Sequence, residues 1–317
     1  MDLSRRDLIS SIAATTAGVV ATGMAANSSA AMEQQNEYAE LGKKMQGKKF
    51  RMHYAPHFGM FSNHAASDLD QLKFAADEGF TAWEDNGMGG RPIEFQEKFA
   101  KTMADLKMTM GVFVVNMQTA WSPTLSTGAA DSRNKFLEEC KAAVDVAKRV
   151  NAKWMTVVPG TIDYRQEMGY QTANVVESLR YASEIFEPHG LVMVLEPLNY
   201  RDHPSLFLSK IAQGFEICRA VNSPSCKVLF DMYHQQVHEG NLIPNIDRGY
   251  SEVAYFQIGD NPGRQEPTTG EVNYRKIFNH ILNKGFKGVL GMEHGVSTKG
   301  KEGERKLIDA YRWSDSL

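Results

Sequence analysis

The chain has 317 residues, a formal net charge of −3 and ordinary apolar and charged fractions, enough for one large α/β barrel or for two smaller domains. No basic block is present that could neutralise a run of phosphates, so the composition argues against a nucleic-acid-binding protein. We also expect no stable membrane span; a homo-oligomer is left open.

The first 31 residues resemble a targeting segment. Ser4-Arg5-Arg6-Asp7 precedes an apolar run rich in Ala, Thr and Gly, and Ser28-Ser29-Ala30 offers small residues before a cut near Ala31. Paired arginines before such a run are typical of a twin-arginine export signal, which predicts a periplasmic protein. A membrane anchor helix is the weaker alternative, because the apolar run is short and is interrupted by Ser, Thr and Gly. Residues 32–49 are predicted to form a polar linker.

From residue 50 onward, segments with strand and helix patterns alternate to the end of the chain. The predicted strands are 50–55, 80–84, 109–115, 154–158, 191–195, 227–230, 253–258 and 288–292. The predicted helices are 69–78, 92–106, 132–150, 174–186, 206–221, 242–249, 275–283 and 302–313. Eight such units predict a (β/α)8 TIM barrel over residues 50–317. A doubly wound sheet is the alternative, weakened because no Gly-x-Gly-x-x-Gly turn follows the first strand.

Polar side chains follow four strands of the second half. Glu196, Asp231, Gln257 and Glu293 each stand at or just after a strand end, and strand ends of a TIM barrel meet at its catalytic face. Three carboxylates so close would repel each other unless a cation lay between them. Carboxylate and amide oxygens are hard donors, so the predicted cofactor is a divalent metal, Mg²⁺ or Mn²⁺.

Three stretches resemble the hydroxypyruvate isomerase family of the xylose-isomerase-like TIM-barrel superfamily. They are Val194-Leu-Glu-Pro-Leu198, Leu229-Phe-Asp-Met-Tyr-His-Gln-Gln236 and the segment from Gln257 to Tyr274. The resemblance covers about residues 50–313 and is weak in the first half.

The resemblance implies specific roles for residues of this chain. It implies Glu196, Asp231, Gln257 and Glu293 as metal ligands, with Glu196 and Glu293 also as the catalytic acid and base. It implies His234 and Arg264 as substrate contacts; the alternative for Arg264 is an ion pair with Glu266 or Asp260 that braces the loop.

Other residues bear on the size of the substrate. Family members typically read Arg-His-Glu-Pro where this chain has Arg264-Gln265-Glu266-Pro267. His57 near the first strand and Trp121 in the loop after the third are further candidate substrate contacts. Glu266 and Glu271 are interpreted as organisers of the loop.

The predicted activity is interconversion of hydroxypyruvate and tartronate semialdehyde through an enediolate, with a small hydroxy-keto acid or sugar as substrate. Two alternatives stay open. An exported member of the superfamily could be a sugar epimerase or isomerase, or a lyase of 3-keto glycosides. A barrel that only binds carbohydrate through Trp83, Trp121, Trp154 or Tyr164 is the alternative that is not an enzyme.

The three cysteines, Cys140, Cys218 and Cys226, are too few and too scattered for a disulfide framework or a zinc site. They are predicted to be buried thiols, and a bridge between Cys218 and Cys226 is the alternative.

Overall fold

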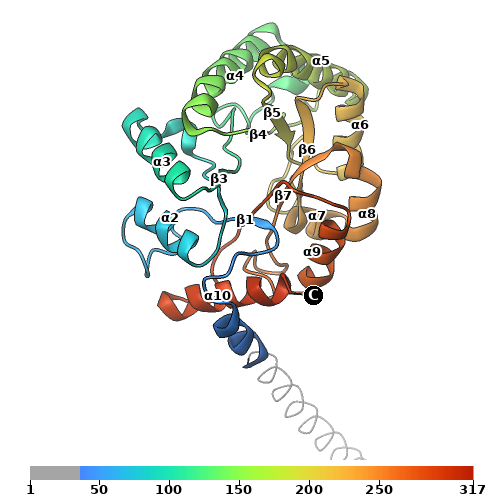
Figure 1. Cartoon of the computed structure of the whole chain (residues 1–317). Helices are drawn as coiled ribbons and strands as arrows, with labels where there is room; N and C mark the ends of the chain where they lie inside the picture. Colours follow the sequence, from blue (N-terminus) through green and yellow to red (C-terminus); the bar gives the residue numbers. More distant parts are fainter. Residues whose placement is uncertain (1–35, 317) are drawn as a thin grey trace, which may run out of the picture.

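The computed structural model describes residues 36–316. Its strands are β1 (His53–Ala55), β2 (Ala82–Trp83), β3 (Thr109–Met110), β4 (Trp154–Val157), β5 (Val192–Leu195), β6 (Cys226–Asp231), β7 (Val253–Gln257) and β8 (Val289–Gly291). Its helices are α2 (Asp68–Asp77), α3 (Ile93–Asp105), α4 (Ala130–Val150), α5 (Met168–Phe186), α6 (Ile211–Val221), α7 (Met232–His238), α8 (Leu242–Gly249), α9 (Tyr274–Asn283) and α10 (Gly300–Ser314). The helices form a ring around the strands, which confirms the predicted TIM barrel (Figure 1).

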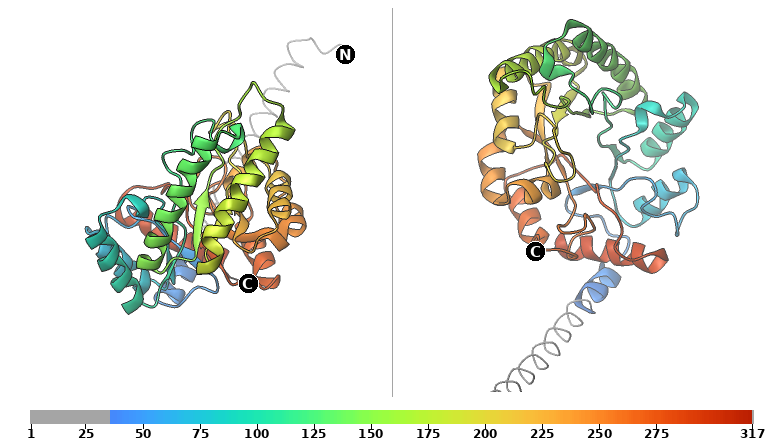
Figure 2. Two further views of the ribbon diagram at one scale, coloured as in Figure 1. Left: turned by 90° about the horizontal axis from the view of Figure 1, so that it is seen from above. Right: turned by 180° about the vertical axis from the view of Figure 1, so that it is seen from behind.

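Parallel pairing runs round the barrel. Six strands follow one another in the order β1-β8-β7-β6-β5-β4, and β2 pairs with β3. Backbone hydrogen bonds join the two sheets: Glu84 donates to the Pro56 carbonyl at 2.9 Å, Val115 donates to Thr156 at 3.0 Å, and Thr156 donates to Phe113 at 2.8 Å. The helices cover the outside of this ring in both further views of the molecule (Figure 2).

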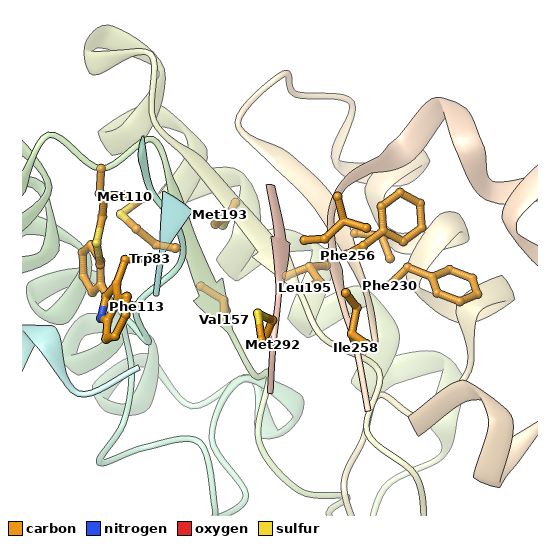
Figure 3. Close-up of a cluster of buried hydrophobic side chains, with 14 of the residues drawn as sticks. Trp83, Met110, Phe113, Val157, Met193, Leu195, Phe230, Phe256, Ile258 and Met292 are labelled. Carbon is orange, nitrogen blue, oxygen red and sulfur yellow. The ribbon is translucent and has the colours of Figure 1, made fainter. Parts of the chain in front are cut away.

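Alternation along the strands separates two apolar layers. Val194, Leu229 and Tyr255 belong to a small cluster inside the barrel, whereas their neighbours belong to the large cluster that contains the apolar faces of the helices. Figure 3 shows Leu195, Phe230 and Phe256 of this outer layer. Because side chains alternate at every residue of a strand, the next inward positions after these three lumen residues are Glu196, Asp231 and Gln257.

Several elements differ in extent from the sequence-based expectations, among them α5, which begins at Met168 rather than at residue 174. The predicted strand 109–115 is regular only over Thr109–Met110; Gly111 leaves room for Tyr255, whose hydroxyl oxygen would lie 2.4 Å from a Cβ there. The predicted helix 206–221 begins at Ile211, because Leu206 pairs with Thr161 in an antiparallel bridge. Helix α7 was not predicted, and the Asp231 side chain caps it by accepting from the backbone N–H groups of Tyr233 and His234.

Residues 36–45 form a helix inside the segment predicted to be a linker. It lies against α10, where the rings of Tyr38 and Trp313 are 4.8 Å apart. The predicted export signal lies outside the described residues and stays a prediction. Among the described residues, no helix is both long and apolar enough to cross a bilayer.

The three cysteines are buried free thiols, as predicted. The sulfur atoms of Cys218 and Cys226 are 4.0 Å apart and are not joined.

Candidate active site

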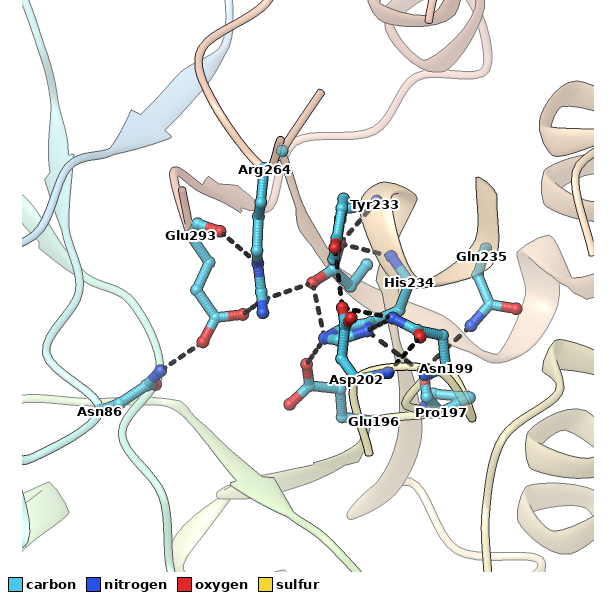
Figure 4. Close-up of polar contacts among 12 residues, drawn as sticks. Asn86, Glu196, Pro197, Asn199, Asp202, Tyr233, His234, Gln235, Arg264 and Glu293 are labelled. Carbon is cyan, nitrogen blue, oxygen red and sulfur yellow. Dashed lines mark hydrogen bonds and ion pairs between the residues drawn. The ribbon is translucent and has the colours of Figure 1, made fainter. Parts of the chain in front are cut away.

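Four polar side chains meet at the C-terminal end of the barrel because their strands are in register. Asp231 of β6 is paired with Gln257 of β7, and Gln257 is paired with Gly291, two residues before Glu293. One side-chain atom from each of Glu196, Asp231, His234 and Glu293 lies within 4.8 Å of the others. The structure therefore brings the three predicted carboxylates together, and Figure 4 shows Glu196 and Glu293 converging on this centre.

Arg264 enters the same cluster from the loop after β7. Its Nη2 donates to Glu293 Oε2 at 2.7 Å and to Asp231 Oδ2 at 3.2 Å, and its Nε donates to the Glu293 carbonyl at 3.1 Å. Its guanidinium also lies 4.9 Å from the centre of the Tyr233 ring. The alternative partners of Arg264, Glu266 and Asp260, are engaged elsewhere, so its charge is directed into the site.

The hydrogen bonds of His234 fix which of its ring nitrogens faces the cluster. The Asn199 amide is oriented by the backbone N–H groups of Arg201 and Asp202, which both donate to its oxygen at 3.0 Å. Its NH₂ group therefore donates to His234 Nδ1 at 2.7 Å, and the Asn199 backbone N–H donates to the same atom at 3.3 Å. With Nδ1 an acceptor, the neutral ring carries its proton on Nε2, which lies 3.6 Å from Asp231 Oδ2.

Burial dominates the electrostatics of the cluster. It raises the pKa of Glu196 well above its usual range, and the nearby Glu293 and Asp231 charges add to this shift. Burial also raises the pKa of Glu293 to about 7, although Arg264 opposes it. It lowers the pKa of His234 to about 4, so this imidazole is neutral at pH 7 and its Nε2–H is free to donate to a ligand.

Several buried polar atoms at the centre have no hydrogen-bond partner within residues 36–316. They are Glu196 Oε1, His234 Nε2 and both amide atoms of Gln257. A buried polar group without a partner costs about 1–3 kcal/mol, and Glu196 Oε1 and His234 Nε2 lie only 3.8 Å apart, so these unpartnered atoms indicate that a ligand completes the site. Three carboxylates, an amide and a single arginine suit a divalent cation bound through oxygen.

A fourth buried acid lies beneath the cluster. Glu84 occupies the inward position after β2, where Tyr255 donates its hydroxyl to Oε2 at 2.9 Å. Burial raises the pKa of Glu84 well above its usual range, and Glu293 raises it further. Sequence reasoning missed Glu84, although the alternation that places Glu196 also places it: Ala82 lies inside the barrel and Glu84 stands two positions on.

Gly291 leaves the space that Glu84 occupies. A Cβ on Gly291 would lie 2.0 Å from Glu84 Oε2, so Gly291→Ala is expected to lower the free energy of unfolding by about 1–3 kcal/mol through overpacking. The measurement is the midpoint of urea denaturation. Gly169→Ala in α5 is the matched control, since no atom lies within 4 Å of its added Cβ; equal midpoints for the two variants would contradict this account.

The cluster opens into a cavity of about 230 Å³. Glu196, His234, Arg264, Glu293 and Asn86 form its polar side, and Asn86 donates its side-chain N–H to Glu293 Oε1 at 2.8 Å. The rest of the lining is formed by Val114, Met117, Ala120, Trp121, Val158, Leu198 and His203. The cavity thus includes the predicted contacts His234, Arg264 and Trp121, and it adds Asn86 and His203.

His57 lies apart from the residues that line this cavity. Its Nδ1 is 2.9 Å from the Phe58 carbonyl oxygen and its Nε2 is 3.3 Å from that of His294. His294 contacts the Tyr311 hydroxyl at 2.8 Å. The His57 imidazole therefore contacts backbone carbonyl groups, and the His294 imidazole contacts the hydroxyl of a buried tyrosine.

The loop after β7 is held by its own acids, as interpreted from the sequence. Glu266 accepts hydrogen bonds from the backbone N–H and hydroxyl of Ser297, and Glu271 accepts from Asn261 at 2.7 Å. Gln265 lies against Gly295 and is not among the residues that line the cavity.

Comparison with known proteins identifies the family. A family model described as "Xylose isomerase-like TIM barrel" matches residues 72–317. The chain belongs to this family. Hydroxypyruvate isomerase of Escherichia coli (strain K12) is 30% identical over 56% of this chain and 69% of the relative. The 2-oxo-tetronate isomerase of Cupriavidus necator is 27% identical over 74% of this chain and 89% of the relative. These relatives support the assignment of the chain as an isomerase.

Solved structures with the same fold are more distant in sequence. AP endonuclease family 2 from Brucella melitensis covers 80% of this chain and 96% of its own, with a TM-score of 0.69 and 23% identity. D-psicose 3-epimerase from Clostridium cellulolyticum H10 covers 83% of this chain and 96% of its own, with a TM-score of 0.65 and 16% identity. The IOLI protein with a binding zinc atom covers 83% and 95%, with a TM-score of 0.63 and 17% identity. All three share the barrel of this chain.

Proposed function

We propose that this chain is a metal-dependent isomerase that interconverts hydroxypyruvate and tartronate semialdehyde, or a close 2-oxo acid relative. Such a reaction removes a proton next to a carbonyl, passes through an enediolate and returns a proton to the neighbouring carbon. The observation on which the proposal depends is the cluster of Glu196, Asp231 and Glu293, with Gln257 beside it, at the catalytic end of the barrel. Relatives named hydroxypyruvate isomerase and 2-oxo-tetronate isomerase give the substrate class.

Glu196, Asp231, Gln257 and Glu293 would hold the divalent metal. The unpartnered atoms of Glu196 and Gln257 support this set. His234 is less suited to be a ligand than to be a donor, because its Nε2 carries the proton. When bound, Mg²⁺ or Mn²⁺ acts as a Lewis acid that stabilises negative charge on the substrate oxygens.

The remaining chemistry is assigned to side chains of this chain. Glu196 and Glu293 are assigned to proton transfer, because burial raises the pKa of Glu293 to about 7 and also raises the pKa of Glu196. Asn86 holds Glu293 by donating to Oε1, while Arg264 holds its other oxygen. His234 Nε2–H faces the same space and is positioned to donate to a substrate oxygen.

The direct test is turnover. Purified protein supplied with Mn²⁺ or Mg²⁺ is expected to convert hydroxypyruvate to tartronate semialdehyde, and to exchange deuterium from solvent into the carbon next to the carbonyl. Exchange separates an enzyme from a barrel that only binds carbohydrate. Turnover of ketohexoses or 3-keto glucosides, without turnover of 2-oxo acids, would replace this proposal by the sugar epimerase or lyase alternative.

Arg264→Gln is expected to lower kcat/KM about 10–100-fold, with most of the effect in KM. The reason is that a charge-assisted hydrogen bond contributes about 1.5–3 kcal/mol, and Arg264 is the positive side chain that lines the cavity. Steady-state kinetics on hydroxypyruvate measure the effect. Arg275→Gln is the matched control, because Arg275 stacks on Trp313 of α10 and does not line the cavity. A similar loss in both variants would contradict a role of Arg264 in substrate binding.

A further inference from the structure

One wall of the cavity is a series of rings that leads outward from the acid cluster. His234 is fully buried beside Asp231. His203 follows, with its ring centre 5.4 Å from that of His234. Trp121 stacks on His203 at 5.4 Å with an interplanar angle of 27°, and it is 52% exposed. The series therefore runs from the reacting centre to solvent.

A three-carbon substrate is too short to use this wall. Carbon–carbon bonds of about 1.5 Å place the end carbons of a three-carbon chain only about 2.5 Å apart. With its terminal oxygen atoms such a molecule spans about 5 Å, close to one step of 5.4 Å between neighbouring rings. With its reacting carbons at the carboxylates, hydroxypyruvate would therefore leave the space beside Trp121, two steps from His234, unfilled.

The chemistry of the outer wall suits hydroxylated carbons. Trp121, Met117 and Leu198 offer apolar surface on which C–H groups can pack. The His203 imidazole makes no side-chain hydrogen bond to the described residues, so its ring nitrogens are available to substrate hydroxyls. The loop that carries His203 is held in place, because Asn199 accepts from the backbone of Arg201 and Asp202.

We propose that Trp121 and His203 form a second subsite that binds the distal, hydroxylated carbons of a substrate of four to six carbons. The subsite rests on the proposed function, since it requires the reacting end of the substrate to lie at Glu196 and Glu293. It sets a preference by length: a 2-oxo acid or ketose with additional hydroxylated carbons binds better than hydroxypyruvate.

The experiment measures this preference in wild type, Trp121→Ala and His203→Ala. The wild type is expected to show a kcat/KM at least about tenfold higher for a four-carbon 2-oxo acid than for hydroxypyruvate, as one filled carbon position is worth about 10–200-fold. Each variant is expected to reduce this ratio about tenfold, mainly through KM. Tyr170→Ala, on an exposed residue of α5 outside the cavity lining, is the matched control and is expected to leave the ratio unchanged.

Dissociation constants from calorimetry on the Mn²⁺-loaded proteins keep the two proposals separable. If no compound is turned over but binding depends on length and on Trp121, the isomerase proposal fails and the subsite stands. If hydroxypyruvate is turned over and Trp121→Ala weakens both substrates equally, the subsite is wrong. Trp121→Phe, which keeps an aromatic face, is expected to restore most of the preference; equal loss in Phe and Ala variants with unchanged melting temperatures would also overturn it.

Discussion

Glu196→Gln and Glu293→Gln are each expected to lower kcat on hydroxypyruvate about 10²–10⁴-fold, the range that general acid–base catalysis contributes. Each substitution keeps the size of the side chain and removes its ability to exchange a proton. One carboxylate oxygen of Glu196 lies within 4.8 Å of one of Glu293, so both groups can reach adjacent carbons of one small substrate. The measurement is kcat at saturating substrate and metal.

Loss of a metal ligand would also reduce kcat, so each variant needs a second readout. Solvent deuterium exchange into the substrate separates the two roles, because a variant that lacks only one proton-transfer group can still exchange at the other carbon. Glu138→Gln is the matched control, since this exposed glutamate of α4 pairs with Lys141 and is not among the residues that line the cavity. Full activity in Glu196→Gln or Glu293→Gln would remove that residue from the mechanism.

The barrel and the placement of polar side chains at its C-terminal end could be predicted from the sequence because both depend on short-range patterns. Along β5, β6 and β7, an apolar run ends in a polar residue at an inward position, two residues after Val194, Leu229 and Tyr255. Parallel register then brings these ends together, as Asp231 and Gln257 show. Alternation and strand direction are local rules, so they can be read without knowledge of tertiary contacts.

The parts that could not be predicted depend on contacts between distant segments. Asn86 donates to Glu293, which is 207 residues away in the sequence. Asn199, in the loop after β5, donates to His234 of α7. Gly111 interrupts a strand pattern because Tyr255 crosses the lumen to Glu84. Nothing in the flanking residues reports such a neighbour. Helix α7 is a different case, because Asp231 at its start was a readable N-cap signal.

Removal of the metal is expected to abolish activity, and Mn²⁺ or Mg²⁺ is expected to restore it. Protein treated with a chelator should also melt several degrees lower than loaded protein, since a ligand at 100 times its Kd stabilises the folded state by about 2.7 kcal/mol. Thermal denaturation with and without metal measures this shift. Unchanged melting and full activity after exhaustive chelation would exclude the proposed metal site.

The affinity for Mn²⁺ is expected to rise as the pH increases through about 7. Burial raises the pKa of Glu293 to about 7 and also raises that of Glu196, so below neutral pH these groups hold protons that the metal must displace. Calorimetry in buffers of different ionisation enthalpy counts the protons released. Glu293→Gln is expected to reduce the proton count, whereas Gln257→Leu is expected to weaken binding without reducing it, because an amide does not titrate. A proton count that falls equally in both variants would contradict the assignment of Gln257 as a neutral ligand beside ionisable ones.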